Sequence, residues 1–476
     1  MTARSSRAYR VFNLAAQVHL SLVLFVFGII QPAAAQNVRT QWVARVNGLV
    51  QPPDNNTATK AIAGDSNDNV YVTGQITISK FHTEAVTIKY DSFGKVVWKA
   101  FLTGRGGFAQ GQSIAVDSAG STYVLGSLDL GGCCHAQELF TAKYNPKGVR
   151  LWIDFYEIPP SPNGAIAGQI ATDKSGNVYV TGNPDNHGPW VVIKYNSNGK
   201  RLWAARSSFE IANGPAGLVV DSQRNVYVTG SSSHNSAFFA EAMTVKYDVN
   251  GKQLWLDTFQ EPLGNTDVGS YGTGNGIALD SAGNAYVAGN SQLLTQSGTQ
   301  SSKALLIKYR PDGKRLWLTE YQHPSSQGKT QVNAFALDSK GNAFLTGSEF
   351  DTATNVSNYS TLKLDSNGKI LWERLYNGPG MGPLVSANAI ALDPSGAVYV
   401  TGQSASPDGS SFTNLTTVKY DTNGNQKWAA RYQGPVNGGD TGVGVTYLSL
   451  GKLAVTGDGA AGSTGYGWVT IGYTQF

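Results

Sequence analysis

Two adjacent cysteines are the residues of this chain whose type and spacing most directly suggest redox chemistry. Cys133 and Cys134 lie within Gly131–His135, and the 476 residues contain no other cysteine. In an oxidising compartment such a pair can form a strained vicinal disulfide, but it cannot staple distant segments. The sequence leaves two interpretations open: an incidental loop disulfide and a disulfide beside a redox cofactor.

The histidines would form a metal site if their rings met at one point. Five of them follow the N-terminal segment: His82, His135, His187, His234 and His323. We expect all five in variable loops on one face of the molecule, but each in a different place around it. Zinc needs its ligand nitrogens at about 2 Å from one ion. We therefore predict solvated loop histidines and no metal site.

A lysine and an aspartate recur at fixed positions along the chain. The lysines are Lys89, Lys143, Lys194, Lys246, Lys308, Lys363 and Lys419. Recurrence at one strand position favours a structural role, either stacking on an aromatic ring or pairing with the following Asp, over a polyanion-binding ring. The aspartate precedes glycine-rich turns without the spacing or terminal Glu of an EF-hand, so turn capping is favoured over calcium binding.

These residues belong to an internal repeat of about fifty-five residues. Its first part reads DKSGNVYVTG at Asp173–Gly182 and occurs eight times, the last copy being degenerate at Leu450–Gly457. Its second part joins Lys-Tyr to a glycine turn and a tryptophan, as in KYDSFGKVVW at Lys89–Trp98. The tryptophans that we assign to the structural repeat are Trp42, Trp98, Trp152, Trp203, Trp255, Trp317, Trp372 and Trp428.

Each repeat predicts four short antiparallel strands, which is the blade of a β-propeller. The 56 glycines, 22 tyrosines and only 14% charged residues agree with an all-β fold of short strands and tight turns. The eighth repeat ends with the segment Trp468–Phe476 and lacks the fourth strand, which carries the repeat tryptophan in the other copies. Thr40–Asn47, with Trp42, resembles that missing fourth strand. The sequence therefore predicts eight blades, closed when the N-terminal strand completes the last one.

The pattern D-x-x-G-N-x-Y-V-T-G followed by K-Y-D-x-x-G-x-x-x-W closely resembles the SBBP-type β-propeller repeat over nearly all of residues 37–476. The resemblance implies an exported bacterial propeller of a family usually without an assigned activity. The family's name suggests seven blades, whereas the repeats of this chain count to eight. The Gly-x-x-x-Trp strand also resembles the eight-bladed quinoproteins, which implies pyrroloquinoline quinone, calcium and a vicinal disulfide as at Cys133 and Cys134.

The N-terminal segment has the features of an export signal. The first ten residues carry three arginines and no acid, an apolar run covers Leu20–Ile30, and Ala33–Ala35 follow. This order is typical of a signal peptide, and the run is too short for the roughly 20 apolar residues of a membrane span. We predict a signal peptide over residues 1–35, one propeller domain over residues 36–476, and a periplasmic or extracellular protein.

The charge balance of the mature chain is close to neutral, which gives no basic patch for nucleic acid. We expect a monomeric, non-catalytic module without a cofactor that binds a protein or glycan through variable loops on one face or the mouth of the central channel. The alternatives are a quinoprotein-like oxidoreductase and a polysaccharide-active hydrolase. A hydrolase would need two carboxylates about 5 to 9.5 Å apart.

Overall fold

The computed structural model describes the greater part of the chain after the N-terminal segment. The described residues are 38–47, 57–129, 131, 137–156, 164–184, 188–207, 211–233, 239–265, 267–296, 300–324, 329–380, 384–406, 412–435, 438–460 and 466–476. They form strands joined by turns and contain no helix. The predicted signal peptide, Cys133, Cys134, His135, His187 and His234 all lie outside the described residues.

Most of the strands form four-stranded antiparallel sheets, as the all-β prediction requires. Four of these sheets take their strands in chain order: β2 to β5 (Ala58–Gly64, Val70–Ser79, His82–Tyr90, Val96–Thr103), β6 to β9 (Ala109–Val116, Thr122–Asp129, Gln137–Tyr144, Arg150–Tyr156), β10 to β13 (Ile166–Thr172, Val178–Asn183, Val191–Tyr195, Arg201–Arg206) and β26 to β29 (Ser386–Leu392, Val398–Ala405, Thr413–Tyr420, Gln426–Tyr432).

A fifth four-stranded sheet joins the two ends of the described chain. Its order is β1 (Val38–Asn47), β32 (Tyr466–Gln475), β31 (Lys452–Ala460) and β30 (Thr441–Tyr447). The first and last strands pair antiparallel, from Val38 opposite Gln475 to Asn47 opposite Gly467. The strand that contains Trp42 therefore lies at the sheet position that a tryptophan strand occupies elsewhere.

The remaining twelve strands are hydrogen-bonded into one larger sheet. Within it, three antiparallel runs follow the chain: β14 to β17 (Ile211–Val220, Val226–Ser233, Phe239–Tyr247, Gln253–Phe259), β18 to β21 (Asp267–Leu279, Ala285–Thr295, Gln300–Tyr309, Arg315–Tyr321) and β22 to β25 (Lys329–Leu337, Ala343–Asp351, Val356–Leu364, Ile370–Tyr376). Short parallel pairings join β16 to β18 and β20 to β22. We call each run of four strands a unit, here and in the smaller sheets.

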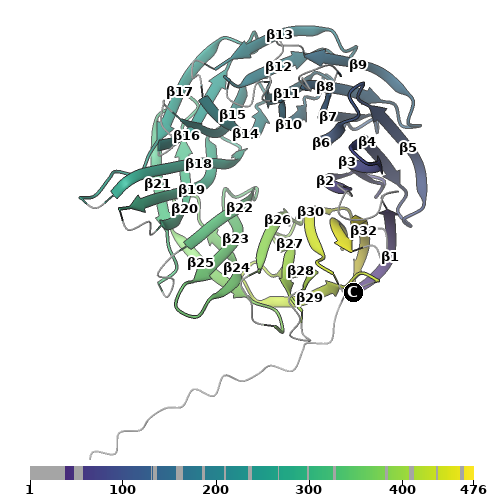
Figure 1. Cartoon of the computed structure of the whole chain (residues 1–476). Helices are drawn as coiled ribbons and strands as arrows, with labels where there is room; N and C mark the ends of the chain where they lie inside the picture. Colours follow the sequence, from purple (N-terminus) through teal and green to yellow (C-terminus); the bar gives the residue numbers. More distant parts are fainter. Residues whose placement is uncertain are drawn as a thin grey trace, which may run out of the picture. The chain divides into compact units, whose positions relative to one another are not determined.

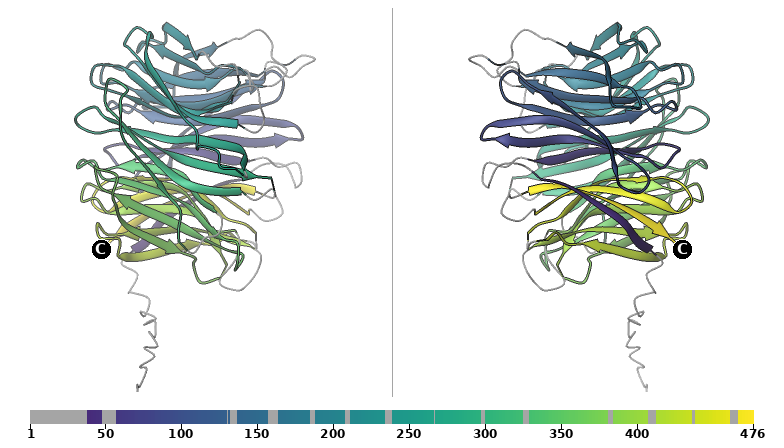
Figure 2. Two further views of the ribbon diagram at one scale, coloured as in Figure 1. Left: turned by 90° about the vertical axis from the view of Figure 1, so that its left-hand side faces the viewer. Right: turned by 90° about the vertical axis from the view of Figure 1, so that its right-hand side faces the viewer.

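The units are arranged in a ring within Gln36–Phe476 (Figure 1). The first strand of each unit lies on the inside of the ring and the tryptophan strand on the outside. In the side views of Figure 2 the strands run between the two faces of this ring. Turns between the first and second strands, and between the third and fourth, share one face, which we call the turn face. The longer connections lie on the other, which we call the loop face.

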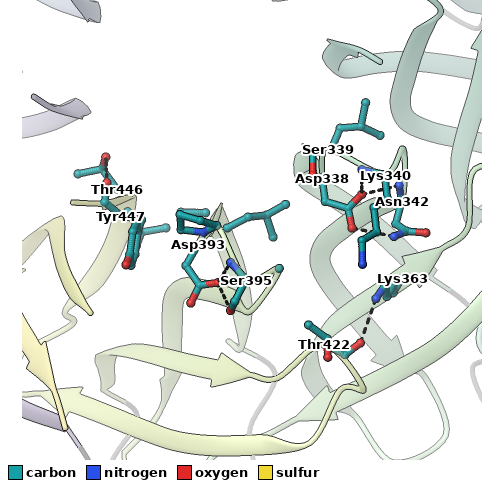
Figure 3. Close-up of a pocket in the computed structure, with 16 residues that line it drawn as sticks. Asp338, Ser339, Lys340, Asn342, Lys363, Asp393, Ser395, Thr422, Thr446 and Tyr447 are labelled. Atoms are coloured by element: carbon teal, nitrogen blue, oxygen red, sulfur yellow. Dashed lines mark hydrogen bonds between the residues drawn. The ribbon is translucent and has the colours of Figure 1, made fainter. Parts of the chain in front are cut away.

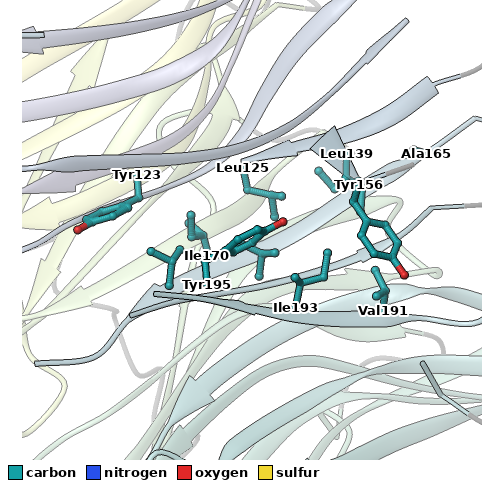
Figure 4. Close-up of a cluster of buried hydrophobic side chains, with 12 residues drawn as sticks. Tyr123, Leu125, Leu139, Tyr156, Ala165, Ile170, Val191, Ile193 and Tyr195 are labelled. Carbon is teal, nitrogen blue, oxygen red and sulfur yellow. The ribbon is translucent and has the colours of Figure 1, made fainter. Parts of the chain in front are cut away.

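The core lies between neighbouring sheets. In the cluster of Figure 4, Leu125 and Leu139 of one unit pack against Ile170, Val191 and Ile193 of the next. Because a sheet inside the ring is covered on both faces, its central strands are apolar on both sides rather than alternating. No helix in the described part of the chain is both long and apolar enough to span a bilayer.

The turns of the repeat form through local hydrogen bonds from the recurrent aspartate. Oδ1 of Asp173 accepts the backbone N–H groups of Ser175 and Asn177 at 2.8 and 3.0 Å. These bonds satisfy backbone donors that the turn leaves unpaired. The prediction of turn capping is thus confirmed for the aspartates whose contacts the structure describes.

The tryptophan strands contact the glycine turns of the following unit. Gly94 has a φ of 79°, and a Cβ built on it would lie 2.4 Å from Cδ2 of Trp42. Nε1 of Trp42 donates to the carbonyl oxygen of Ser92 at 3.3 Å, and its ring stacks on Tyr90 at 5.9 Å. Glycine is required at position 94 for two reasons. Its φ lies in the left-handed region, and the indole of Trp42 leaves no room for a side chain.

Candidate functional site

The sequence-predicted site residues that the structure describes do not come together. His82 begins β4, whereas Nε2 of His323 lies 3.5 Å from Oε2 of Glu373. Among the described residues, no three His, Cys, Asp or Glu side chains are placed to hold a metal ion. The vicinal disulfide at Cys133 and Cys134 stays a prediction because neither cysteine is described.

The recurrent lysine bridges neighbouring units on the turn face. Nζ of Lys143 lies 5.0 Å from the ring centroid of Tyr123, and it donates to the carbonyl oxygen of Ser197 in the next unit at 3.3 Å. Nε1 of Trp152 donates to the same carbonyl at 3.2 Å. Of the two structural roles predicted for this lysine, stacking on an aromatic ring is confirmed here. Its hydrogen-bond partner at this position is a backbone carbonyl.

The tyrosine under the lysine completes the motif by binding the aspartate of its own turn. The hydroxyl donates to Oδ2 of that aspartate in five units, and the pairs are Tyr71 with Asp65 (2.8 Å), Tyr123 with Asp117 (2.9 Å), Tyr179 with Asp173 (3.0 Å), Tyr227 with Asp221 (3.5 Å) and Tyr399 with Asp393 (2.9 Å). In each of these five turns, the carboxylate therefore accepts a hydrogen bond from the hydroxyl of a buried tyrosine.

A groove of about 630 Å³ opens on the turn face where β22, β26 and β30 end. These are inner strands of the ring (Figure 1), and Figure 3 shows the residues that line the groove. Its polar lining includes Asp338, Lys340, Asn342, Lys363, Asp393, Ser395, Thr422, Thr446 and Tyr447. Three consecutive units thus contribute side chains of both charges, hydroxyls and an amide to one hollow.

A second hollow of about 550 Å³ lies on the same face beside the ends of β10 and β14. There Arg224 reaches from one turn to the next. Its Nη2 donates to Oγ of Ser175 at 3.2 Å, and its Nε lies 3.8 Å from Oδ2 of Asp173. The chain's own guanidinium therefore contacts the polar groups of this second hollow.

The carboxylates of the larger groove are hydrogen-bond acceptors. Burial raises the pKa of Asp393, but hydrogen bonds from Ser395, the Ala397 backbone and Tyr399 outweigh it and lower that pKa overall. Asp338 accepts the N–H groups of Lys340 and Asn342 on Oδ1, and Nδ2 of Asn342 on Oδ2. Nζ of Lys363 donates to the carbonyl oxygen of Thr422 at 3.0 Å. An ionised Asp393 can orient hydroxyl donors but is poorly suited to protonate a leaving group.

A pair of glutamates comes together toward the loop face of the unit β18 to β21. Nζ of Lys303 lies 2.6 Å from Oε1 of Glu261 and 3.4 Å from Oε2 of Glu320. Burial, and then the contact with Glu261, raises the pKa of Glu320, whereas hydrogen bonds lower that of Glu261 despite its burial. Ser291 also donates to Glu261. The two carboxylates therefore share one cation, Lys303.

Sequence reasoning did not find the groove. Asp338, Asp393 and Lys363 were assigned structural roles because they recur, and the same residues line the hollow. One signal was present in the sequence: the sixth copy of the first motif reads DSKGNAFLTG, with Phe344 where most copies have tyrosine. The predicted loop-face site stays a prediction, because much of the loop face lies outside the described residues.

Comparisons with known proteins agree with the repeat. A family model described as a β-propeller repeat, SBBP, matches residues 263–292. An uncharacterized WD repeat-containing protein of Acanthamoeba polyphaga mimivirus is 29% identical over 136 residues, which are 25% of this chain and 9% of that protein. The chain therefore matches less than a tenth of that relative's length.

Two solved structures show distant similarity. The β-propeller domain of the trilobed protease from Pyrococcus furiosus is 10% identical with a TM-score of 0.42, covering 79% of this chain and 96% of that one. An ulvan lyase of polysaccharide lyase family 25 is 11% identical with a TM-score of 0.42, covering 83% and 94%. These similarities do not bear on what this chain binds or catalyses.

The segment matched by the family model contains β18 and most of β19, and the same motifs recur in the other units of the ring. Repeated motifs that fold into repeated four-stranded antiparallel units are what a propeller requires. Residues 263–292 therefore match the SBBP β-propeller repeat, and the chain resembles an SBBP-type β-propeller protein.

Proposed function

We propose that this chain is an exported, non-catalytic propeller of eight blades that binds a glycan in the turn-face groove. Eight motif copies support the blade count, and each run of the twelve-stranded sheet has the strand order of a separate blade. The pairing of β1 with β32 supports closure by the N-terminal strand. Such a closure leaves no open sheet edge between the first and last blades.

The residues that line the groove are the main support for the proposed glycan ligand. A volume of about 630 Å³ is in the range of small-ligand sites. Among the lining side chains, Asp338 and Asp393 can accept hydrogen bonds. Lys340 and Lys363 can donate them, so two negative and two positive charges balance. A hydroxyl both donates and accepts, so a neutral polyhydroxyl ligand can bind acceptors and donors of both signs without bringing a charge of its own.

The proposed binding role needs no acid–base chemistry in the groove. General acid catalysis at neutral pH requires a carboxyl group whose pKa is raised, and the pKa of Asp393 is lowered. The raised pKa of Glu320 belongs to an ion-pair network with Lys303 toward the other face. The oxidoreductase alternative depends on Cys133 and Cys134, which the structure does not describe.

The test is binding of the purified protein to a panel of polysaccharides and oligosaccharides by calorimetry. Asp393→Asn removes an acceptor from the groove, and Asp117→Asn makes the same change at the equivalent turn of β6 and β7, away from the groove. Both aspartates accept a tyrosine hydroxyl at 2.9 Å and two backbone N–H groups of their own turn, and Asp393 also accepts the Ser395 hydroxyl. We expect Asp393→Asn to weaken binding at least tenfold and Asp117→Asn to leave it unchanged. No binding to any glycan, or equal loss in both variants, would overturn the proposal.

A further inference from the structure

One unit of the ring has phenylalanine at the position from which a tyrosine hydroxyl binds the turn aspartate in five other units. In the unit β22 to β25, Phe344 occupies that position and Asp338 is the turn aspartate. A phenyl ring cannot donate a hydrogen bond, so Oδ2 of Asp338 has no ring hydroxyl as a partner. The turn of this unit forms one wall of the larger groove.

The replacement leaves the rest of the motif in place. Phe344 is fully buried, and Nζ of Lys363 lies 5.1 Å from its ring centroid. The corresponding lysine-to-ring distances are 5.1 Å for Lys89 and Tyr71 and 5.0 Å for Lys143 and Tyr123. The ring therefore keeps its position under the lysine, and only the oxygen atom is missing.

Phe344 itself is fully buried and is not among the lining residues, but the two polar groups beside it line the groove. In five of the six units with tyrosine at this position, the hydroxyl oxygen lies 2.8 to 3.5 Å from the aspartate Oδ2. Asp338 and Lys363 both line the groove, as Figure 3 shows. A hydroxyl group that enters from the groove can meet the Asp338 carboxylate as the tyrosine hydroxyl does elsewhere, beside an ammonium group that balances the charge.

We propose that Phe344 determines the specificity of the groove by reserving the place of one oxygen atom for a ligand hydroxyl, which donates to Oδ2 of Asp338. The inference rests on the proposed function, since it names the contact by which that site selects a polyhydroxyl ligand. A hydroxyl bound to a carboxylate forms a charge-assisted hydrogen bond, which is stronger than one between neutral groups. A ligand that lacks a hydroxyl at this point leaves Asp338 without that bond.

The decisive variant is Phe344→Tyr, which gives this unit the residue that six others carry. Its own hydroxyl is expected to bind Asp338 and fill the reserved place, so the fold is retained while the ligand is excluded. The matched control is Tyr123→Phe, which removes the hydroxyl from a unit outside the groove. We expect Phe344→Tyr to melt no lower than the wild type and to lose glycan affinity at least tenfold, and Tyr123→Phe to bind as the wild type does.

The contact itself is tested with D-glucose as the probe, soaked into crystals of the wild type and of Phe344→Tyr. We expect a glucose hydroxyl within hydrogen-bond distance of Oδ2 of Asp338 in the wild type, and the tyrosine hydroxyl there in the variant. Glucose bound without this contact, no glucose in the wild-type groove, or unchanged glycan affinity in Phe344→Tyr would overturn the inference. Glycan binding that Asp393→Asn abolishes and Phe344→Tyr preserves would refute only the inference, whereas absence of all glycan binding would refute the proposed function.

Discussion

The contact between Trp42 and Gly94 can be tested by adding one methyl group. Gly94→Ala places a Cβ where Trp42 now lies, 2.4 Å from Cδ2 of its indole. Gly120→Ala is the matched control, because Gly94 and Gly120 share a φ of 79° and end the same kind of turn. A Cβ on Gly120 meets nothing nearer than Cγ of Pro146 at 3.6 Å, which is ordinary van der Waals contact.

The two variants differ only in what the methyl group displaces. Both force alanine into the left-handed region, which costs about 1 kcal/mol. Gly94→Ala must also move Trp42, which breaks the hydrogen bond to the Ser92 carbonyl, worth about 1 kcal/mol, and the stacking on Tyr90, worth about 1 kcal/mol. We therefore expect losses of about 3 kcal/mol for Gly94→Ala and about 1 kcal/mol for Gly120→Ala.

The assay is equilibrium unfolding in urea, followed by tryptophan fluorescence and by far-ultraviolet circular dichroism. Coincident transitions by the two probes would permit a free energy to be taken from each curve. Losses that agree to within about 0.5 kcal/mol would refute the reasoning, because steric contact with Trp42 would then contribute nothing. A larger loss for Gly94→Ala than for Gly120→Ala would locate the strain at the contact between β1 and the turn that joins β4 to β5.

Two further predictions concern the sheet that joins the chain ends. Burial raises the pKa of Asp458 to about 7, so the folded state holds an extra proton between about pH 4 and 7 and stability falls as the pH rises through that range. Asp458→Asn should therefore stabilise the protein by about 2 kcal/mol at pH 8 and have little effect at pH 4. Thermal melts at the two pH values measure this, and an equal effect at both pH values would contradict the prediction. The side chain of Gln475 accepts Nε1 of Trp428 at 3.3 Å and donates to the Gly451 carbonyl at 3.0 Å. Gln475→Ala should cost about 2 kcal/mol in urea unfolding and Thr474→Ala under 1 kcal/mol, and the reverse order would exclude this role for Gln475.

The repeat made much of the fold predictable from the sequence. Turn capping by Asp173 involves only residues within four positions, so it follows from local sequence alone. The apolar pattern on both sides of the VYVTG strand indicated a sheet covered on both faces. The pairing of Lys143 with the Ser197 carbonyl lay beyond such reasoning, because that donor and acceptor belong to different units.

The groove required the tertiary structure. Its walls come from the turns after β22 and β26 and the end of β30, and only their arrangement around the ring brings Asp338, Asp393 and Tyr447 to one hollow. The ion pairs of Lys303 likewise join distant parts of the chain, because Glu261 lies in the connection between β17 and β18, Lys303 in β20 and Glu320 in β21.

The sequence by itself determined the repeat unit, its turns and its all-β character, because these depend on hydrogen bonds and apolar patterns within short segments. The sequence also shows phenylalanine at position 344, where most copies of the repeat have tyrosine, but the repeat alone did not indicate a role for this difference. Only the tertiary structure decided that this difference lies beside residues that line a groove, because the hollow between three units depends on how their turns lie beside one another in space.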